Sequence, residues 1–285
     1  MADGGGAEIL DRAPDLKIVR APNPGPMTLD GTRTYVLGRA SVVVIDPGPR
    51  DSSHLGAVLE AIGDRPVKAL MLTHAHADHA GLSRDLASGL GCPIRASSAT
   101  LARLGLTEEG EQLVDGTTVD VEPNRELMPL ATPGHSRDHF CFLELPSRRL
   151  FTGDLVLGTG SSAILHPDGR VEDAMSSLAR LAALRPSELL PGHGDPVEDA
   201  GGKLAEYRTH RAERGRQVER AVRSGLTSVP EIRRAVYGPL PPGLSRAADA
   251  SVAAHLSALA DAGRGADLVD SLADLDAYGL DEDDQ

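Results

Sequence analysis

The sequence contains few aromatic residues: four Tyr, three Phe and no Trp among 285 residues. Proteins that bind single-stranded nucleic acids stack bases on aromatic side chains, so this composition provides little material for such a platform. The sequence also lacks any run of 18 apolar residues, which excludes a transmembrane helix, and we expect no membrane partner. Its two cysteines, Cys92 and Cys141, make no disulfide framework. We expect both to be small buried thiols in a reducing compartment.

The N-terminal segment lacks the features of a secretory signal. Its first residues, MADGGGAEILDRAPDLK, contain neither a basic stretch nor an apolar one. Because Gly, Ala and Asp dominate, we expect residues 1–16 to be a flexible segment. With the reduced cysteines, these features predict a cytoplasmic protein.

The net charge of −13 is distributed unevenly. Residues 1–202 hold 18 basic and 28 acidic side chains (−10), residues 203–264 hold 11 and 6 (+5), and residues 265–285 hold none and 8 (−8). An acidic body with an acidic tail argues against a protein that coats nucleic acid. A nucleic-acid partner is therefore disfavoured, although the basic segment leaves room for a local patch.

Short apolar runs alternate with helical patterns through the first 202 residues. Strands are expected at Thr34–Leu37, Val42–Ile45, Ala69–Leu72, Pro93–Arg95, Glu126–Leu130, Phe140–Leu145, Leu150–Thr152 and Glu188–Leu190. Helices are expected at Ser53–Ile62, His79–Ser88, Ala99–Leu104 and Glu172–Leu184. A strand-rich start followed by βα alternation predicts an α/β layered domain over residues 17–202.

A helical module is expected over residues 203–264. Its first helix, Lys203–Arg223, ends before a glycine. The second begins at Ser228, which forms a capping box with Glu231, and stops near Gly238. The third, Ser245–Ala262, carries an apolar face formed by Val252, Leu256 and Leu259. An acidic tail follows over residues 265–285.

The motif THAHADH, residues 73–79, carries the clearest chemical signal. A chain of this composition contains His-x-His-x-Asp-His by chance about once in a thousand cases. The motif follows the predicted strand Ala69–Leu72, so it lies where that strand ends. Imidazoles two residues apart on an extended loop can bind one ion, and the following Asp and His can turn to a second.

Three further polar residues occupy the same kind of position. His135 in TPGH, Asp154 in FTGD and His193 in PGHG each come shortly after a predicted strand and next to a glycine. The carboxyl ends of strands are where α/β sheets bind ligands, and glycine allows the backbone to approach closely. The four motifs therefore predict one convergent site.

The number of candidate ligands suits two metal ions. His74, His76 and His135 would hold one ion, Asp78, His79 and His193 the other, and Asp154 would bridge them. Three protein ligands per ion leave an open position, as in catalytic rather than structural zinc sites. A bridging water would then ionise near neutral pH and attack a carbonyl or phosphoryl centre. We expect two Zn²⁺ per chain, with iron or manganese as alternatives, and Asp78 and Asp154 as the catalytic carboxylates.

The order of these motifs resembles the metallo-beta-lactamase superfamily over residues 17–200. The strings NPGPMTLDGTRTY (23–35), IDPG (45–48), GDLVLG (153–158), HRAER (210–214) and SVAAHL (251–256) resemble its beta-lactamase-like protein 2 branch, which is related to glyoxalase II. The resemblance implies an αββα sandwich with the metals at one edge and a small C-terminal winged-helix-like module.

Two departures from this resemblance concern function. Members of the branch usually have Asn where this chain has Arg33, and the acidic residues 265–285 replace the usual wing. The third helix has only Arg246 near its start, whereas a recognition helix would be basic. The arginines gather instead at residues 208–223, where we favour a solvated helix face.

Four residues around the ligands are expected to support them or to contact substrate. Asp46 should hold the metal loop. His139 is expected either to support a ligand or to face substrate, with a structural role equally open. Ser161 and Ser162 lie in a loop that could touch substrate, but no base is left to make either a nucleophile.

The leading hypothesis is a dinuclear zinc hydrolase that acts on a thioester or ester of a small or carrier-bound acyl group. Glyoxalase II and carrier-protein thioesterases are the nearest models. The alternative is an endoribonuclease acting on single-stranded RNA, as the animal member of the branch does. A mono-iron persulfide dioxygenase and a metal-stabilised DNA-binding regulator are further alternatives. Whether the chain forms a homodimer is left open.

Overall fold

The computed structural model describes residues 6–241, 243–263 and 275–278. The chain forms two units. The first contains the described residues up to 131 together with residues 138–160 and 186–200, and the second contains residues 132–137, 161–185 and the described residues from 201 onward. The predicted boundaries at 202 and 264 stay predictions.

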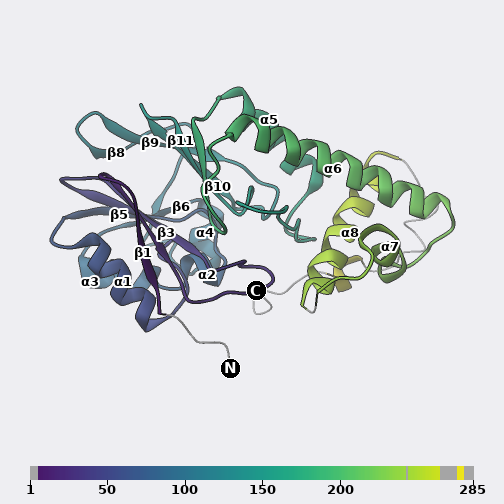
Figure 1. The fold of residues 1–285 in the computed structure, drawn as a ribbon, viewed down its shortest axis with the longest axis horizontal. Helices are drawn as coiled ribbons and strands as arrows, with labels where there is room; N and C mark the ends of the chain where they lie inside the picture. Colours follow the sequence, from purple (N-terminus) through teal and green to yellow (C-terminus); the bar gives the residue numbers. More distant parts are fainter. Residues whose placement is uncertain (1–5, 242, 264–274, 279–285) are drawn as a thin grey trace. The chain divides into compact units, whose positions relative to one another are not determined.

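Two β-sheets form the frame of the first unit (Figure 1). The larger sheet contains, in chain order, β1 (Glu8–Ala13), β2 (Leu16–Arg20), β3 (Arg33–Leu37), β4 (Val42–Ile45), β5 (Val67–Met71), β6 (Ile94–Ala96) and β7 (Glu111–Gln112). The smaller sheet has the order β12 (Glu188–Pro191), β11 (Arg149–Gly153), β10 (Phe140–Leu145), β9 (Arg125–Ala131) and β8 (Val119–Glu122). Strands β4 to β7 pair in parallel, so their carboxyl ends lie at one edge.

The centre of the larger sheet is apolar on both faces, because each face has a partner there. In β4, Val42 and Val44 belong to the core that includes Val58 and Ile62 of helix α1 (Ser52–Ile62). The alternate residues Val43 and Ile45 belong to the core shared with the smaller sheet. The two-residue period of a strand explains this division. Strands buried on both faces read as continuous apolar runs, which is why this one was predictable from sequence.

Three corrections apply to the predicted elements of the first unit. Glu8–Ala13 forms the edge strand β1, so the expectation of a flexible segment is wrong there. The strands β2, β7 and β8 were not predicted at all. The single helix expected from His79 to Ser88 is two helices, α2 (Ala77–Ala80) and α3 (Ser83–Leu90).

The break between α2 and α3 has a local cause. Gly81 lies so close to the neighbouring loop that a Cβ there would come within 3.0 Å of the backbone nitrogen of Arg50. The amide of Leu82 donates to the carbonyl of Gly48 at 3.1 Å, and the amide of Gly48 donates to the carbonyl of His79 at 2.9 Å. The Gly48 loop thus takes hydrogen bonds that a continuous helix would make internally. The helix α4 (Ser98–Arg103) follows β6 and is capped by Ser97.

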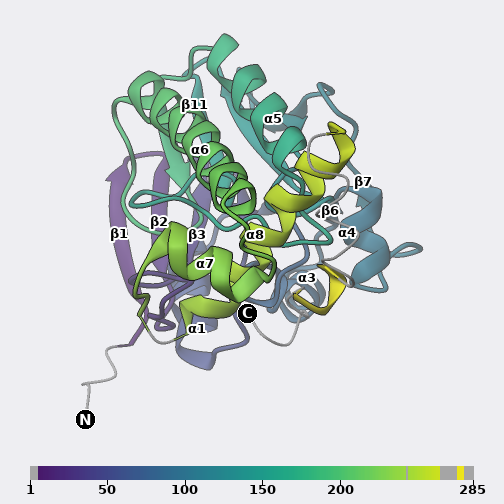
Figure 2. The ribbon, with the colours of Figure 1, turned by 90° about the vertical axis from the view of Figure 1, so that its right-hand side faces the viewer.

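The second unit contains α5 (Val171–Ala183), α6 (Ala200–Arg223), α7 (Val229–Tyr237), α8 (Leu244–Asp261) and the 3-10 turn Leu275–Tyr278. Figure 2 shows α8 running from beside α7 toward α5, and it contacts both helices. The predicted capping box is present at the start of α7, and the helix ends at Gly238. Val252 and Leu256 of α8 are buried in one apolar cluster, with Leu259 packed against it, as predicted.

The arginines of α6 do not form a uniformly solvated face. Arg208, Arg216 and Arg220 are exposed, but only 6% of Arg211 is. Arg214 is half-buried, with its guanidinium 4.0 Å from the ring centre of Tyr237. The expectation of a solvated face is therefore wrong for Arg211 and Arg214.

Two other expectations concern the whole chain. Both cysteines are buried and neither forms a disulfide, as predicted. Among the described residues, no helix has the length and apolar character needed to cross a membrane. The predicted acidic tail falls outside the described residues except for Leu275–Tyr278.

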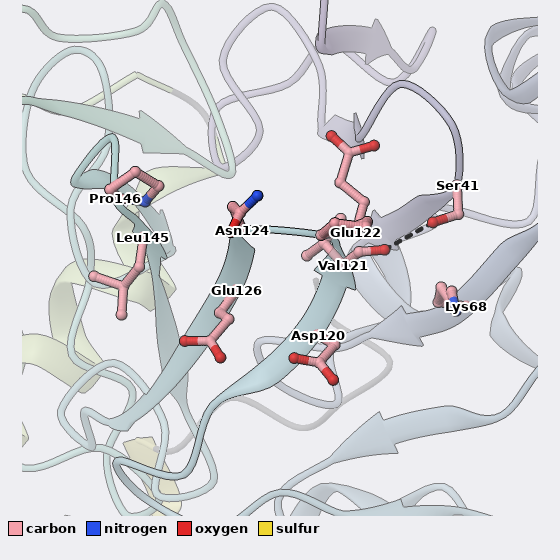
Figure 3. A pocket seen from close by; sticks show the side chains of 10 residues that line it. Ser41, Lys68, Asp120, Val121, Glu122, Asn124, Glu126, Leu145 and Pro146 are labelled. Carbon is pink, nitrogen blue, oxygen red and sulfur yellow. Dashed lines mark hydrogen bonds between the residues drawn. The ribbon is translucent and has the colours of Figure 1, made fainter.

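The end of the first unit where β5 begins carries an acidic hollow of about 680 Å³ (Figure 3). Lys68 of β5 lines it together with Asp120 of β8 and Glu126 of β9, which are paired across the two strands. The hydroxyl of Ser41 donates to the carbonyl of Val121 at 2.8 Å and ties the two sheets together there. The histidine motif follows the other end of β5, so this hollow is not part of its site.

Candidate metal centre

The histidine motif begins where β5 ends. The strand stops at Met71, and α2 starts with His76 as its N-cap residue. His74 and His79 are fully buried, and His76 is 5% exposed. Buried imidazoles require partners for both ring nitrogens, so the surroundings of this loop determine which nitrogen each ring directs to the centre.

The first unit brings five of the seven predicted ligands into two overlapping groups. His74, His79 and Asp154 form one group, and Asp78, His79 and His193 form the other. In each group one ligand atom per residue lies within 4.8 Å of the others. His76 adjoins the first group, with its Nδ1 2.7 Å from Nε2 of His74. These residues come from the ends of β5, β11 and β12, as the sequence predicted.

His79 and His193 both direct their Nε2 atoms toward the centre of the cluster. Their Nε2 atoms are 3.3 Å apart. Nε2 of His79 lies 3.3 Å from Oδ1 of Asp154 and 3.5 Å from Oδ2 of Asp78. Nε2 of His193 lies 3.2 Å from Oδ2 of Asp78 and 3.3 Å from Oδ2 of Asp154. Two imidazole nitrogens and two carboxylates therefore converge on one small volume.

The two carboxylates of this cluster favour a cation at its centre. Burial disfavours the ionised form of Asp78 and Asp154, but the neighbouring histidines outweigh it and hold the pKa of both carboxyls well below its ordinary value. Burial likewise opposes protonation of His193, but Asp154 and Asp78 outweigh it and raise its pKa to about 9. The pKa of His79 is raised by the same carboxylates and by Asp46. A metal ion supplies the positive charge that these protons otherwise provide, so the donor set fits a metal.

Asp46 holds the loop and sets two ring orientations. Its Oδ1 accepts the amide of Thr73 at 2.8 Å, and its Oδ2 accepts the Thr73 hydroxyl at 2.7 Å. Oδ2 also lies 2.9 Å from Nδ1 of His79, which therefore donates and leaves Nε2 toward the centre. The Thr73 hydroxyl in turn lies 2.8 Å from Nδ1 of His74. Asp46 thus occupies the position expected of a residue that supports the metal loop.

His139 contacts Asp154, a predicted ligand, rather than open space. Its Nε2 accepts the backbone amide of Asp154 at 3.1 Å, and its ring centre lies 5.2 Å from that of His74. This contact favours the supporting role over the substrate-facing one. Glycine makes the approach possible: a Cβ on Gly153 would lie 2.6 Å from Nε2 of His139.

Sequence reasoning missed two supports of the centre. Asp138 is buried, and its carboxylate accepts the amide of Ala75 at 3.0 Å and the hydroxyl of Thr100 at 2.8 Å. The hydroxyl of Thr32 donates to Oδ2 of Asp78 at 3.3 Å, and Asn23 donates to the same hydroxyl at 2.9 Å. Nothing local distinguishes Asp138 from an ordinary loop carboxylate. The string around Asn23 carries no signal of its own beyond the family resemblance.

The remaining predicted residues belong to the second unit. Nδ1 of His135 lies 2.9 Å from the carbonyl of Ala163, which places its proton on Nδ1. Ser162 is buried, and its hydroxyl accepts Arg211 at 2.8 Å, while Ser161 is exposed. The roles of His135, Ser161 and Ser162 stay predictions.

Arg33, which replaces the usual Asn, is buried, and its side chain contacts the loop that precedes it in the chain. Its guanidinium pairs with Asp30 at 2.6 Å and donates to the carbonyl of Gly31 at 3.0 Å. The amide of Arg33 also donates to the carbonyl of Gly192, one residue before His193, at 2.8 Å. This residue therefore helps to hold the loop that adjoins His193.

Comparison with known proteins gives consistent matches. The model of the metallo-beta-lactamase superfamily matches residues 27–193. A Drosophila melanogaster protein named beta-lactamase-like protein 2 homolog is 30% identical over 262 residues, which cover 85% of this chain and 86% of that protein. The atrochrysone carboxyl ACP thioesterase of Aspergillus chevalieri is 33% identical over 251 residues, 82% of this chain and 77% of that protein.

A solved structure matches over most of the chain. A metallo-beta-lactamase family protein from Thermus thermophilus superposes with a TM-score of 0.72 and 26% identity. The match covers 88% of this chain and 95% of that one. The sequence-based expectations of the family and of an α/β fold are thereby confirmed.

Proposed function

Because the chain belongs to the metallo-beta-lactamase superfamily, we propose that it cleaves the thioester or ester of a carrier-bound or small acyl group with two zinc ions. The coarser statement, that it is a metal-dependent hydrolase, rests on the family match and on the metal-fitting His and Asp cluster. The two zinc ions and the acyl substrate belong to the proposal.

The observation that carries the proposal is the double grouping of ligands around His79. His74 and Asp154 group with it on one side, and Asp78 and His193 on the other. We assign His74, His76 and His135 to one ion and Asp78, His79 and His193 to the second, with Asp154 shared. His135 lies on a six-residue segment whose chain neighbours, Ala131 and Asp138, both belong to the first unit, which supports its place among the ligands.

The side chains would act mainly by binding and orienting. When bound, the metal ions supply a hydroxide nucleophile near neutral pH and stabilise the negative charge that develops on the attacked carbonyl oxygen. Asp46 keeps a proton on Nδ1 of His79, so that Nε2 remains available as a ligand. Asp78 and Asp154 stay ionised at neutral pH, because their pKa values are held low. Neither carboxyl therefore needs to release a proton before the ligand set can form.

Two observations support an acyl substrate: the name of a relative and the negative net charge of residues 1–202. The Aspergillus chevalieri relative is named as a thioesterase for an acyl group on a carrier protein. Residues 1–202 carry a net charge of −10 from 18 basic and 28 acidic residues, which disfavours a polyanion at the catalytic unit. A thioester carbonyl requires no basic track along the protein surface.

Metal analysis combined with thioester hydrolysis tests the proposal. We expect about two zinc ions per purified chain and release of free thiol from acyl-carrier thioesters. The His193→Ala variant should lose metal and at least about 100-fold in kcat/KM, whereas His166→Gln, outside the cluster, should lose neither. Two zinc ions without thioester or ester turnover would reject the substrate class, and one iron per chain with oxygen uptake would favour the dioxygenase alternative.

The endoribonuclease alternative predicts that arginines of α6 contribute to RNA binding, and charge reversal on this helix tests it. Charge reversal at the buried Arg211 would damage the fold, so exposed residues of α6 must be used. Arg216 and Arg220 both pair with Glu213, at 2.7 and 2.9 Å, which reduces the positive charge they present. If the unaltered metal-loaded chain does not cleave single-stranded RNA, that alternative is wrong; if it does, Arg208→Glu and Arg220→Glu should slow the cleavage.

A further inference from the structure

The second unit contains a hollow that plays no part in the metal centre. Its volume is about 270 Å³. Its walls come from α5, α6 and α8 and are largely apolar, with Val171, Met175 and Leu259 among them. Arg211 and His255 also line it. This volume lies below the usual range for drug-sized ligands, so only a small molecule would fit.

Arg211 is a buried cation that no carboxylate among the described residues balances. Its side chain is 6% exposed. Its Nη2 donates to the carbonyl of Ser162 at 2.7 Å and to the hydroxyl at 2.8 Å. Its Nε has no hydrogen-bond partner, and no ion pair to Arg211 exists among the residues that the structure describes. Burying a guanidinium without a paired anion raises the free energy of the folded state, and a bound anionic ligand would lower it again.

The other basic groups beside Arg211 do not relieve this imbalance. Arg214 uses Nη1 to donate to the carbonyl of Val236 at 2.7 Å and to Gln217 at 2.8 Å, and its Nε also lacks a partner among the described residues. His255 is buried against both arginines; burial and their charge together lower its pKa and keep its ring neutral. Arg214 therefore adds to the positive charge around Arg211, and the neutral His255 does not change it.

The charged residues nearer the surface are already paired. Arg216 pairs with Glu213 at 2.7 Å, and Glu219 pairs with Arg223 at 2.8 Å. Glu172 lies 4.0 Å from Arg170. The acidic residues that line the hollow, Glu172 and Glu219, would also repel a dianion. One unbalanced guanidinium and apolar walls suit a monoanion with a small apolar body.

We propose that this hollow binds the carboxylate of a small apolar monocarboxylic acid, with Arg211 as its counter-ion. The carboxylate would accept the Nε hydrogen of Arg211, and the hydrocarbon part would lie against Val171, Met175 and Leu259. Guanidinium groups bind carboxylates with good geometry and remain charged when buried. The inference is independent of the proposed hydrolysis, because every residue it uses lies in the second unit.

Calorimetric titration of the metal-loaded full chain with hexanoate tests the site. We expect saturable binding, at least about tenfold weaker binding of hexanamide, and no binding of inorganic phosphate at the same concentration. Arg211→Met keeps the side-chain length, removes the charge and should weaken hexanoate binding at least about tenfold. Arg208→Met, an exposed arginine on the same helix, should bind as the unaltered chain does.

A second variant keeps the test decisive if Arg211→Met does not fold. A Cβ on Gly215 would lie 3.5 Å from the ring of His255, an ordinary contact, so Gly215→Leu should fill the hollow and also abolish binding. The His193→Ala variant should retain binding, because it alters only the metal centre. No binding to the unaltered chain, phosphate binding as tight as hexanoate binding, or loss of binding in His193→Ala but not in Gly215→Leu would each overturn the proposal.

Discussion

Asp46 makes three contacts that together orient the metal loop. It adopts a positive φ of 49°, which is uncommon for a residue other than glycine. From this position its two oxygens reach the backbone and hydroxyl of Thr73 and the Nδ1 of His79. An unusual backbone conformation at a residue that orients ligands is typical of functional sites.

Asp46→Asn should weaken metal binding without removing a ligand. The amide nitrogen cannot accept a hydrogen bond, so one of the contacts to Thr73 or His79 must be lost. We expect roughly a 10- to 100-fold loss of zinc affinity, measured by competition with a chromogenic chelator. Asp64→Asn, at an exposed position, is the matched control. Equal affinities in the two variants would show that Asp46 does not support the centre.

The predicted ligands could be found from the sequence where they follow directly after a strand. His74, His79, Asp154 and His193 all come shortly after an apolar run, and the end of such a run is visible in the sequence. Asp138 and Thr32 were not predictable, because their contacts with Ala75 and Asp78 depend on how separate segments pack. Arg211 was misjudged because charge alone suggests exposure, while its burial depends on the packing of the second unit.

At the scale of elements, predictability follows burial. Strands that are buried along all or nearly all of their length, such as β4 and β10, have the bounds that the apolar runs indicate. The edge strand β1 was missed because its sequence, EILDRA, is half charged and largely exposed. Charged residues on edge strands protect the sheet from pairing with other chains. The same charged residues make β1 difficult to predict from the sequence.

The β8–β9 hairpin carries a like-charge pair whose removal should stabilise the first unit. Asp120 and Glu126 are directly opposite each other in the strand register and line the acidic hollow (Figure 3). Asp120→Thr removes the repulsion and adds a residue with higher strand propensity. We expect a gain of about 0.5 kcal/mol in urea unfolding at low salt, falling at high salt as charges are screened. Glu108→Thr, an exposed acid in a loop, should give no such gain; a gain in Asp120→Thr that does not change with salt would contradict the electrostatic cause.

His255 should make α8 sensitive to acid. Burial, with Arg211, Arg214 and His210 nearby, lowers its pKa to about 3, against 6.5 for an exposed histidine. A depressed folded-state pKa means that the unfolded chain binds the proton first. Stability is therefore complete above about pH 6.5 and is lost as the pH falls from there toward 3, by on the order of 4 kcal/mol.

Circular dichroism of the unfolding transition between about pH 7 and pH 4 measures this effect. His255→Leu should flatten the dependence of the midpoint on pH, whereas His166→Gln should not. His54, whose pKa burial lowers to about 4, leaves a residual dependence that belongs to the first unit. An undiminished slope in His255→Leu would assign the acid sensitivity to other groups.

At the scale of the first unit, the two sheets are joined by more than apolar packing. Glu144 of β10 is fully buried and pairs with Arg149 of β11 and, at 3.0 Å, with Arg125 of β9. Asp15, in the turn between β1 and β2, pairs with both arginines, which connects the larger sheet to the smaller one. Glu122 also pairs with Arg125 at 2.7 Å, so three acids and two arginines form one network, in which Glu144 is fully buried. The pairing raises the pKa of Arg149 further and lowers that of Asp15 despite their burial.

Glu144→Gln should destabilise the first unit by about 3 kcal/mol, because it leaves Arg149 buried with only one of its two acids. Glu60→Gln, an exposed acid of α1 outside the network, should change the free energy of unfolding by less than about 0.5 kcal/mol. The double variant Glu144→Leu, Arg149→Leu removes both charges and should recover most of the loss, since apolar pairs of similar volume often replace buried ion pairs without cost. If instead the double variant is as unstable as the sum of its single variants, the network contributes by shape rather than by charge balance, and the sheets depend on packing alone.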